Sequence, residues 1–204
     1  MKQLLVEHFP ASVANLSLIN ESKLGNGRMR VRGKIQEAEV LNGNSRKYPK
    51  EVLEKEIQKY IDGPIANRTA MAELDHPDSS VISLNNVSHL ITKIWWEGNN
   101  VMAEIELLNT PSGRIAQEIV SANIPLGISS RAMGSVKQID ENTVEVQDDL
   151  DIIGWDLVST PSTPNAYLKL AEGLNENKTE NRYNKINGLI TEIICNQTGV
   201  CCLC

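Results

Sequence analysis

The stretch Val87–Leu108, VSHLITKIWWEGNNVMAEIELL, predicts a fold that is built on a β-sheet. Two runs rich in Val, Ile, Leu and Trp, Val87–Trp96 and Asn100–Leu108, flank the turn Glu-Gly-Asn-Asn. Gly98 in that turn can adopt a positive φ without steric cost. We therefore expect an antiparallel hairpin in this part of the chain.

Four other stretches add to the expected sheet structure. Met29–Leu41, MRVRGKIQEAEVL, alternates small or apolar with polar residues, and Gly33 within it predicts a bulge or bend. The remaining predicted strands are Gly127–Val136, Thr143–Gln147 and Leu150–Ser159. Strands therefore make up most of the regular structure that we expect.

Two segments have the apolar spacing of amphipathic helices. Pro49–Tyr60 opens with a helix-starting proline, and its apolar residues recur at helical spacing: Val52, Leu53, Ile57 and Tyr60. A second helix is expected to be capped by Thr110 or Ser112 and to end before Pro125. Its expected apolar face consists of Ile115, Ala116, Ile119 and Val120.

The composition is typical of a folded, acidic protein. Only 4% of the 204 residues are aromatic, so Val, Ile, Leu and Ala must fill the core of a single domain. The formal net charge of −6 gives no long-range attraction to nucleic acid. No run approaches the roughly 20 apolar residues of a membrane-spanning helix. We expect a soluble intracellular protein without nucleic-acid or membrane partners.

The C-terminal part of the chain differs from the rest. Gly173–Asn187 is polar and rich in Asn, which is typical of a linker. All four cysteines follow it within the last ten residues, in the spacing C-x5-C-C-x-C, which lacks the paired halves of a structural zinc site. We therefore expect a domain over residues 1–172, a linker and Cys-bearing tail over 173–204, and no metal.

Three histidines limit the choice of a catalytic base. His8 lies near the N-terminus, and His89 lies in the apolar run VSHLI, where a structural imidazole is the simpler interpretation. His76 lies in AELDHP, next to carboxylates and just before Pro77, which predicts a loop position. His76 is therefore the candidate base, with a plain surface histidine as the alternative.

The candidate nucleophiles are Ser129 and Ser130. The chain contains no G-x-S-x-G elbow, and its cysteines are confined to the tail. Gly127 and Gly134 leave room for a substrate backbone, and the charge of Arg131 can favour an oxyanion. The alternative is a strand or turn without a catalytic role.

Five ordered blocks of sequence resemble the prohead core proteases of T4-like tailed bacteriophages, which are capsid maturation serine proteases. Together they cover most of Lys34–Ala166. The blocks are EAEVLNGNSRKYPKEVLEKEIQKYI (Glu37–Ile61), ELDHP (Glu73–Pro77), IWWEGNNV (Ile94–Val101), IPLGISSRAMGS (Ile124–Ser135) and WDLVSTPSTPNA (Trp155–Ala166).

The resemblance implies an α+β fold like that of herpesvirus assemblin, a small barrel of mainly antiparallel strands surrounded by helices. It implies a serine endopeptidase in which His76 is the base and Ser129 the nucleophile, with no cofactor. Backbone N–H groups near Ser130 and Arg131 would hold the oxyanion.

Three acids compete to orient the base. Asp156 resembles the acidic residue that precedes a V-S-x-x-P-like run in related prohead proteases, and we prefer it. Glu73 is second because it is shared with the family pattern and lies near His76, although an ion pair with a basic residue is its alternative role. Asp75 is a doubtful candidate because the family pattern has Asn there.

The resemblance also implies substrates and partners. We expect the prohead scaffold or core proteins, the major capsid protein and the portal as partners, a homo-oligomer, and a location inside the prohead in the bacterial host cytoplasm. Cleavage is expected after Glu in Leu/Ile-x-Glu sites, including self-cleavage between Glu172 and Gly173. A second match, Ile35–Ala38, falls in an expected core strand that should protect it.

Two other functions are compatible with the same residues. The first is an inactive structural or scaffold protein of the prohead that keeps the protease fold. The second is a serine hydrolase that acts on esters or peptidoglycan, although no feature of the chain favours it over the resemblance.

Overall fold

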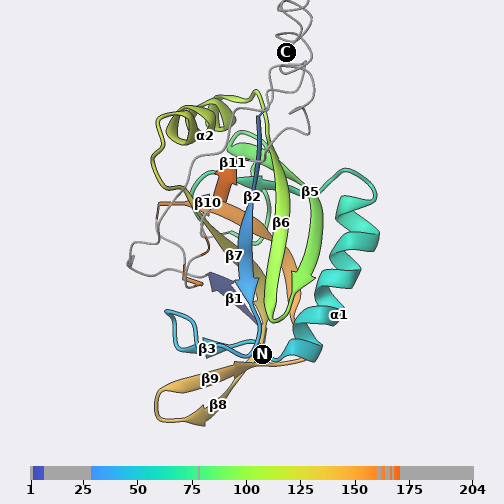
Figure 1. Cartoon of the computed structure of the whole chain (residues 1–204). Helices are drawn as coiled ribbons and strands as arrows, with labels where there is room; N and C mark the ends of the chain where they lie inside the picture. The colour runs from blue at the N-terminus through green and yellow to red at the C-terminus, as the bar shows by residue number, and fades with distance from the viewer. Residues whose placement is uncertain are drawn as a thin grey trace, which may run out of the picture. The chain divides into compact units, whose positions relative to one another are not determined.

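The computed structural model describes residues 2–6, 29–77, 79–159, 162–163, 166 and 168–170, all within the compact unit Met1–Ala171. Figure 1 shows how these residues are arranged. The strands are β1 Gln3–Val6, β2 Met29–Glu37, β3 Arg46–Lys47, β4 Met71–Glu73, β5 Val87–Glu97, β6 Asn100–Leu107, β7 Gly127–Gly134, β8 Val136–Asp140, β9 Thr143–Val146, β10 Asp151–Val158 and β11 Leu168–Leu170. The helices are α1 Lys50–Tyr60, the π-helical turn η1 Ile61–Ile65, and α2 Pro111–Ser121.

The largest sheet has five strands in the order β11-β2-β6-β5-β4, with every neighbouring pair antiparallel. Its centre is the predicted hairpin, in which β5 and β6 pair from Glu97↔Asn100 at the turn onward. Gly98 has φ +65°, the left-handed conformation that the turn requires. The hairpin prediction is therefore confirmed, and β2, β6 and β5 lie side by side in Figure 1.

The predicted irregularity in the first long strand occurs slightly beyond Gly33. The register between β2 and β6 shifts between Lys34 and Gln36, which is a β-bulge. Because of the extra residue, Ile35 and Gln36 are both buried although they are consecutive. Gln36 Oε1 then accepts a hydrogen bond of 3.0 Å from Nε1 of Trp155 on β10.

Two three-stranded sheets complete the described strands, in the orders β1-β7-β10 and β3-β9-β8. The strand predicted over Gly127–Val136 breaks at Ser135, where the backbone N–H donates to Asp149 Oδ1 instead of continuing a ladder. The break separates β7 from β8. The short strands β1, β3, β4, β8 and β11 were not predicted, whereas the equally short β9 lies in the predicted strand Thr143–Gln147.

Both helices begin where the sequence predicts. Pro49 precedes α1, and Thr110 Oγ1 accepts a 3.0 Å hydrogen bond from Gly113 N–H at the start of α2. A Cβ on Gly113 would lie 2.1 Å from the Leu108 carbonyl oxygen, so only glycine fits at this approach. The predicted apolar face of α2 is wrong at Ile115, which is 54% exposed. Ala116 and Val120 are buried, because they face β5 and β6.

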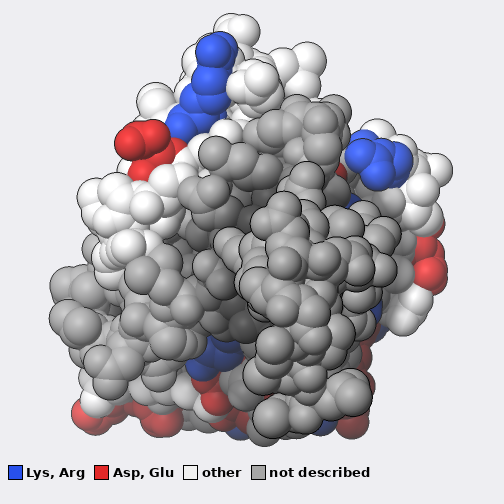
Figure 2. All heavy atoms as spheres, turned by 45° about the horizontal axis from the view of Figure 1, so that its top comes forward, with Lys and Arg blue, Asp and Glu red and all other residues white. Residues whose placement is uncertain are grey.

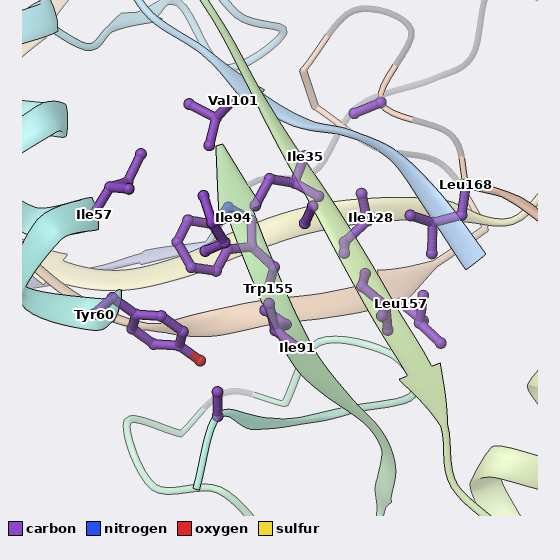
Figure 3. Packing of buried hydrophobic residues seen from close by; sticks show 14 of the residues in the cluster. Ile35, Ile57, Tyr60, Ile91, Ile94, Val101, Ile128, Trp155, Leu157 and Leu168 are labelled. Carbon is purple, nitrogen blue, oxygen red and sulfur yellow. The ribbon is translucent and has the colours of Figure 1, made fainter. Parts of the chain in front are cut away.

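The hydrophobic core lies between the five-stranded sheet, β10 and α1. Figure 3 shows Trp155 of β10 close to Ile91 and Ile94 of β5, with Ile57 and Tyr60 of α1 beside them. The rings of Tyr60 and Trp155 meet edge to face at 5.1 Å between centroids. Each fully buried side chain of this size contributes about 1.5–3 kcal/mol to folding. The core therefore fixes β10 firmly against the large sheet.

The α+β class and the mainly antiparallel pairing are confirmed. The closure of the sheets into a small barrel stays a prediction. Among the described residues, no helix is long and apolar enough to cross a membrane. Basic and acidic side chains are interspersed on the described part of the face in Figure 2, without an extended patch of one sign.

Candidate active site

The two central strands of the candidate site are β7 and β10, which pair antiparallel. Ser129 lies directly opposite Asp156, and Ser130 lies opposite Trp155. Because side chains alternate between the two faces of a strand, Ser129 shares a face with Asp156, whereas Ser130 shares the face of the core residue Trp155. The pairing therefore distinguishes the two adjacent serines that the sequence left as alternatives.

His76 lies in the loop that follows β4, as predicted. Two contacts attach this loop to β10: Leu74 forms a parallel bridge with Leu157, and Asp75 N–H donates to the Leu157 carbonyl at 2.8 Å. Asp75 has φ +64°, a conformation that Asp and Asn tolerate better than most residues. Its backbone, rather than its exposed carboxylate, thus positions His76.

The imidazole of His76 contacts the carboxylate of Asp156. Nδ1 of His76 lies 2.8 Å from Oδ2 of Asp156, and the two side chains are 1% and 0% exposed. A carboxylate can only accept, so Nδ1 carries the hydrogen and the lone pair of the neutral ring is on Nε2. This is the tautomer that a general base requires.

Other groups hold Asp156 in place. Its Oδ1 accepts from the Glu73 backbone N–H at 3.0 Å and from Arg131 Nη2 at 3.2 Å. Nε of Arg131 lies 2.9 Å from Oδ2, in an orientation that makes an ion pair rather than a hydrogen bond. Both oxygens of the carboxylate are therefore fixed, which fixes the direction in which it meets His76.

Arg131 and Glu73 form a buried ion pair beside Asp156. Arg131 Nη2 lies 2.9 Å from Glu73 Oε1, both side chains are 0% exposed, and Nη1 donates to the Ser79 carbonyl at 2.7 Å. Glu73 Oε1 also accepts from Ser83 N–H at 3.1 Å. The guanidinium is thus directed at two carboxylates and a carbonyl, and the ion-pair role of Glu73 that the sequence left open is confirmed.

Ser129 is fully buried, and its Oγ lies 3.3 Å from Oγ of Ser162. Ser162 comes from the segment after β10, and its carbonyl accepts a 3.0 Å hydrogen bond from Gly43 N–H. Ser162 is not among the candidate residues predicted from the sequence. No spacing relates it to Ser129, because 33 residues separate them and only the tertiary structure brings them together.

His89 has the structural role expected of it. Its Nε2 lies 2.9 Å from the Trp155 carbonyl, and its Nδ1 lies 2.8 Å from Ser88 Oγ, so the neutral ring donates to the carbonyl and accepts from the hydroxyl. Complete burial lowers the pKa of His89 to about 4. His89 is therefore neutral near pH 7 and ties β5 to β10 one residue before Asp156.

We expect His89 to make folding sensitive to acid. The pKa of His89 is lower in the folded than in the unfolded chain, so the folded state binds this proton less readily. The contribution of His89 to stability is therefore present above its unfolded-chain pKa near 6.5 and is lost as the pH falls toward 4. His89→Gln keeps a donor and an acceptor without the titration. Between pH 7 and about pH 4.5, the wild type should lose about 2–3 kcal/mol more unfolding free energy than His89→Gln in urea denaturation. Equal losses would contradict this role.

Several predicted features lie outside the described residues: the self-cleavage residues Glu172 and Gly173, the cysteine tail and His8. The second Leu/Ile-x-Glu match, Ile35–Ala38, lies in and directly after β2, in the part of that strand that pairs with β6. Among the described residues, no group of three or more His, Cys, Asp and Glu side chains could hold a metal ion.

Comparisons with known proteins indicate the family to which the chain is related. Residues 13–179 match the family described as prohead core protein serine protease. The prohead core protein protease of Enterobacteria phage T4 is 32% identical over 142 residues, which is 68% of this chain and 66% of that protein, so the match spans just under two thirds of that relative. The solved structure of the bacteriophage T4 capsid assembly protease is similar with a TM-score of 0.66 and 29% identity, covering 77% of this chain and 98% of that one.

Proposed function

Because the chain belongs to the prohead core protein serine protease family, we propose that it is a serine endopeptidase that matures a phage prohead. The observation that carries this proposal is the buried 2.8 Å contact between His76 and Asp156, with Ser129 opposite Asp156 on the neighbouring strand. A nucleophile, a base and an orienting acid on adjacent elements are the parts that serine proteolysis requires.

In the proposed mechanism, Ser129 Oγ attacks the scissile carbonyl while Nε2 of His76 takes its proton. Asp156 accepts the hydrogen bond from Nδ1–H and stabilises the imidazolium that forms. His76 then gives the proton to the leaving amine, and water releases the acyl-enzyme in the reverse sequence.

Backbone N–H groups near Ser130 and Arg131 are the proposed donors to the oxyanion. The Arg131 side chain is not proposed as a direct donor, because its N–H groups face Glu73, Asp156 and the Ser79 carbonyl. Arg131 thus supports the site from behind Asp156, and the mechanism uses no cofactor.

The proposed substrates are prohead scaffold or core proteins and the major capsid protein, cut after Glu in Leu/Ile-x-Glu sites inside the prohead. The portal is a further proposed partner, and the protease is proposed to act as a homo-oligomer in the host cytoplasm. The names of the T4 relatives, a prohead core protein protease and a capsid assembly protease, support the prohead and capsid assembly as the setting of this activity.

Self-cleavage between Glu172 and Gly173 is the sharpest test of this specificity. Leu170-Ala171-Glu172-Gly173 fits the proposed pattern, and β11 ends at Leu170 as a three-residue edge strand on β2. Detaching such a strand breaks few hydrogen bonds, so local opening can present the site. Intact-mass measurement of the wild type should show a chain that ends at Glu172, whereas Ser129→Ala should retain Cys204.

Glu172→Gln provides the matched control, because it should block this cut while the enzyme still processes capsid proteins that are co-expressed with it. An active preparation that keeps Cys204 after cutting its other substrates would contradict the self-cleavage site. Failure of a fluorophosphonate to label Ser129 in a folded chain that cleaves nothing would instead favour an inactive structural protein of the prohead.

A further inference from the structure

Three charged side chains meet in the interior behind His76: Glu73 of β4, Arg131 of β7 and Asp156 of β10. All three are 0% exposed. Arg131 Nη2 bridges the two acids, at 2.9 Å from Glu73 Oε1 and 3.2 Å from Asp156 Oδ1. Burying an unpaired charge costs free energy in such surroundings. The net charge of this cluster therefore affects how strongly a neighbouring group binds a proton.

We propose that Glu73 is a positioning residue that acts through Arg131: its carboxylate neutralises the guanidinium, so that the negative charge of Asp156 is available to the imidazolium of His76. This inference rests on the proposed roles of Ser129, His76 and Asp156, and it adds a role that Glu73 fills through Arg131. The described contacts of the Glu73 side chain are with Arg131 and Ser83 N–H.

Counting the charges gives the physical reason. With a neutral imidazole, the two carboxylates and one guanidinium sum to −1, and the cluster becomes neutral when His76 takes a proton. Without the charge of Glu73, the sum would be 0 and would rise to +1 on protonation. A buried cluster that becomes neutral in the transition state favours proton transfer to His76, whereas one that becomes positive opposes it.

Two other titratable side chains adjoin Asp156 from neighbouring elements, Tyr60 of α1 and His89 of β5. Burial and the charge of Asp156 raise the pKa of Tyr60 above its usual range. Burial lowers the pKa of His89 to about 4. Both groups are therefore neutral between about pH 5 and pH 9, and the charge count above holds over that interval.

Glu73→Gln removes the charge and keeps much of the shape. The amide oxygen can still accept from Arg131 and Ser83, and the amide nitrogen replaces Oε2, which accepts no hydrogen bond from the described residues. Glu56→Gln is the matched control, because Glu56 is also buried and lies 3.3 Å from the ammonium of Lys59, but on α1. A double variant, Glu73→Gln with Arg131→Met, restores the net charge of −1.

The first measurement is the pH dependence of kcat/KM for a peptide substrate. Glu73→Gln should move the midpoint of the acid limb about one pH unit lower and should reduce the plateau value of kcat/KM about tenfold. A tenfold change in the stabilisation of the protonated imidazole corresponds to one pH unit in that midpoint. Glu56→Gln should match the wild type. The double variant should return the acid limb close to its wild-type position, which loss of a purely structural contact would not do.

The second measurement is an NMR titration of His76 in full-length Ser129→Ala protein, with the resonance assigned by its loss in His76→Gln. Its midpoint should fall by about one pH unit on adding Glu73→Gln and recover in the double variant. An unchanged or raised midpoint would overturn the inference. Because this readout needs no activity, a shifted midpoint in Ser129→Ala together with a folded wild-type chain that cleaves nothing would contradict the proposed function and not the charge role.

Folding gives a further discrimination if Glu73→Gln is unstable. Failure of Glu73→Gln to fold, together with folding of the double variant, would support the inference, since the unpaired charge of Arg131 would then be the cause. Failure of both variants would contradict it, because the pair would then be needed for packing and not for its charge balance.

Discussion

Ser129→Ala is expected to abolish peptide-bond hydrolysis, with a loss in kcat of about 10⁵- to 10⁶-fold. The substitution removes the attacking oxygen, which lies on the same face of the β7–β10 pair as Asp156. It should leave the pairing of β7 with β10 intact. His76→Ala should be equally inactive, because proton transfer from the serine is lost. Turnover of a peptide carrying a Leu-x-Glu site, with circular dichroism to check folding, measures both effects.

Ser130→Ala is the matched control for this prediction. Ser130 is adjacent in sequence and also buried, but it lies opposite Trp155 and shares the face of the core. We expect it to reduce kcat/KM by no more than about tenfold, through small changes in packing. An inactive Ser130→Ala beside an active Ser129→Ala would reverse the assignment of the nucleophile.

The second large effect is expected from Asp156→Asn, which should lower kcat by about 10⁴-fold. The amide can donate to His76, so it no longer favours the tautomer with hydrogen on Nδ1 and no longer stabilises the imidazolium. It also leaves Arg131 with one fewer anionic partner in a fully buried position. The rate should be measured at saturating substrate together with the free energy of unfolding, because the substitution is expected to change both kcat and stability.

Asp75→Asn separates this role from simple proximity in sequence. Asp75 is adjacent to His76, yet its side chain is exposed and its contribution is a backbone N–H bond to Leu157 at φ +64°. Asn tolerates the same backbone conformation, so activity should stay within about threefold of the wild type. A large loss in Asp75→Asn with an active Asp156→Asn would transfer the orienting role to Asp75.

Glu73 links the two predictions. The sequence offered Glu73 and Asp156 as rivals for one role, whereas the structure gives them different partners: Arg131 for Glu73, and His76 for Asp156. The two acids therefore fit two roles, one orienting the base and one balancing the guanidinium. The charge-restoring double variant distinguishes these roles more directly than any single substitution.

The sequence by itself determined the local elements and the family. The hairpin of β5 and β6, the start of α1 after Pro49 and the Thr110 cap of α2 were predicted, because periodicity, turn glycines and capping residues act over a few neighbours. The candidate residues His76, Ser129 and Asp156 came from ordered blocks that resemble a family. Short strands such as β4 and β11 carry too few residues for their pattern to be recognised.

Only the tertiary structure decided which of these residues meet. The pairing register of β7 and β10 places Asp156 opposite Ser129, and a loop 80 residues earlier in the chain brings His76 to its carboxylate. The same packing buries Arg131 between two acids, so a side chain that the sequence suggested for the oxyanion instead faces Glu73 and Asp156. Register and burial arise from long-range pairing of strands and from core packing, and a local pattern contains no information on which distant strand its own strand will join.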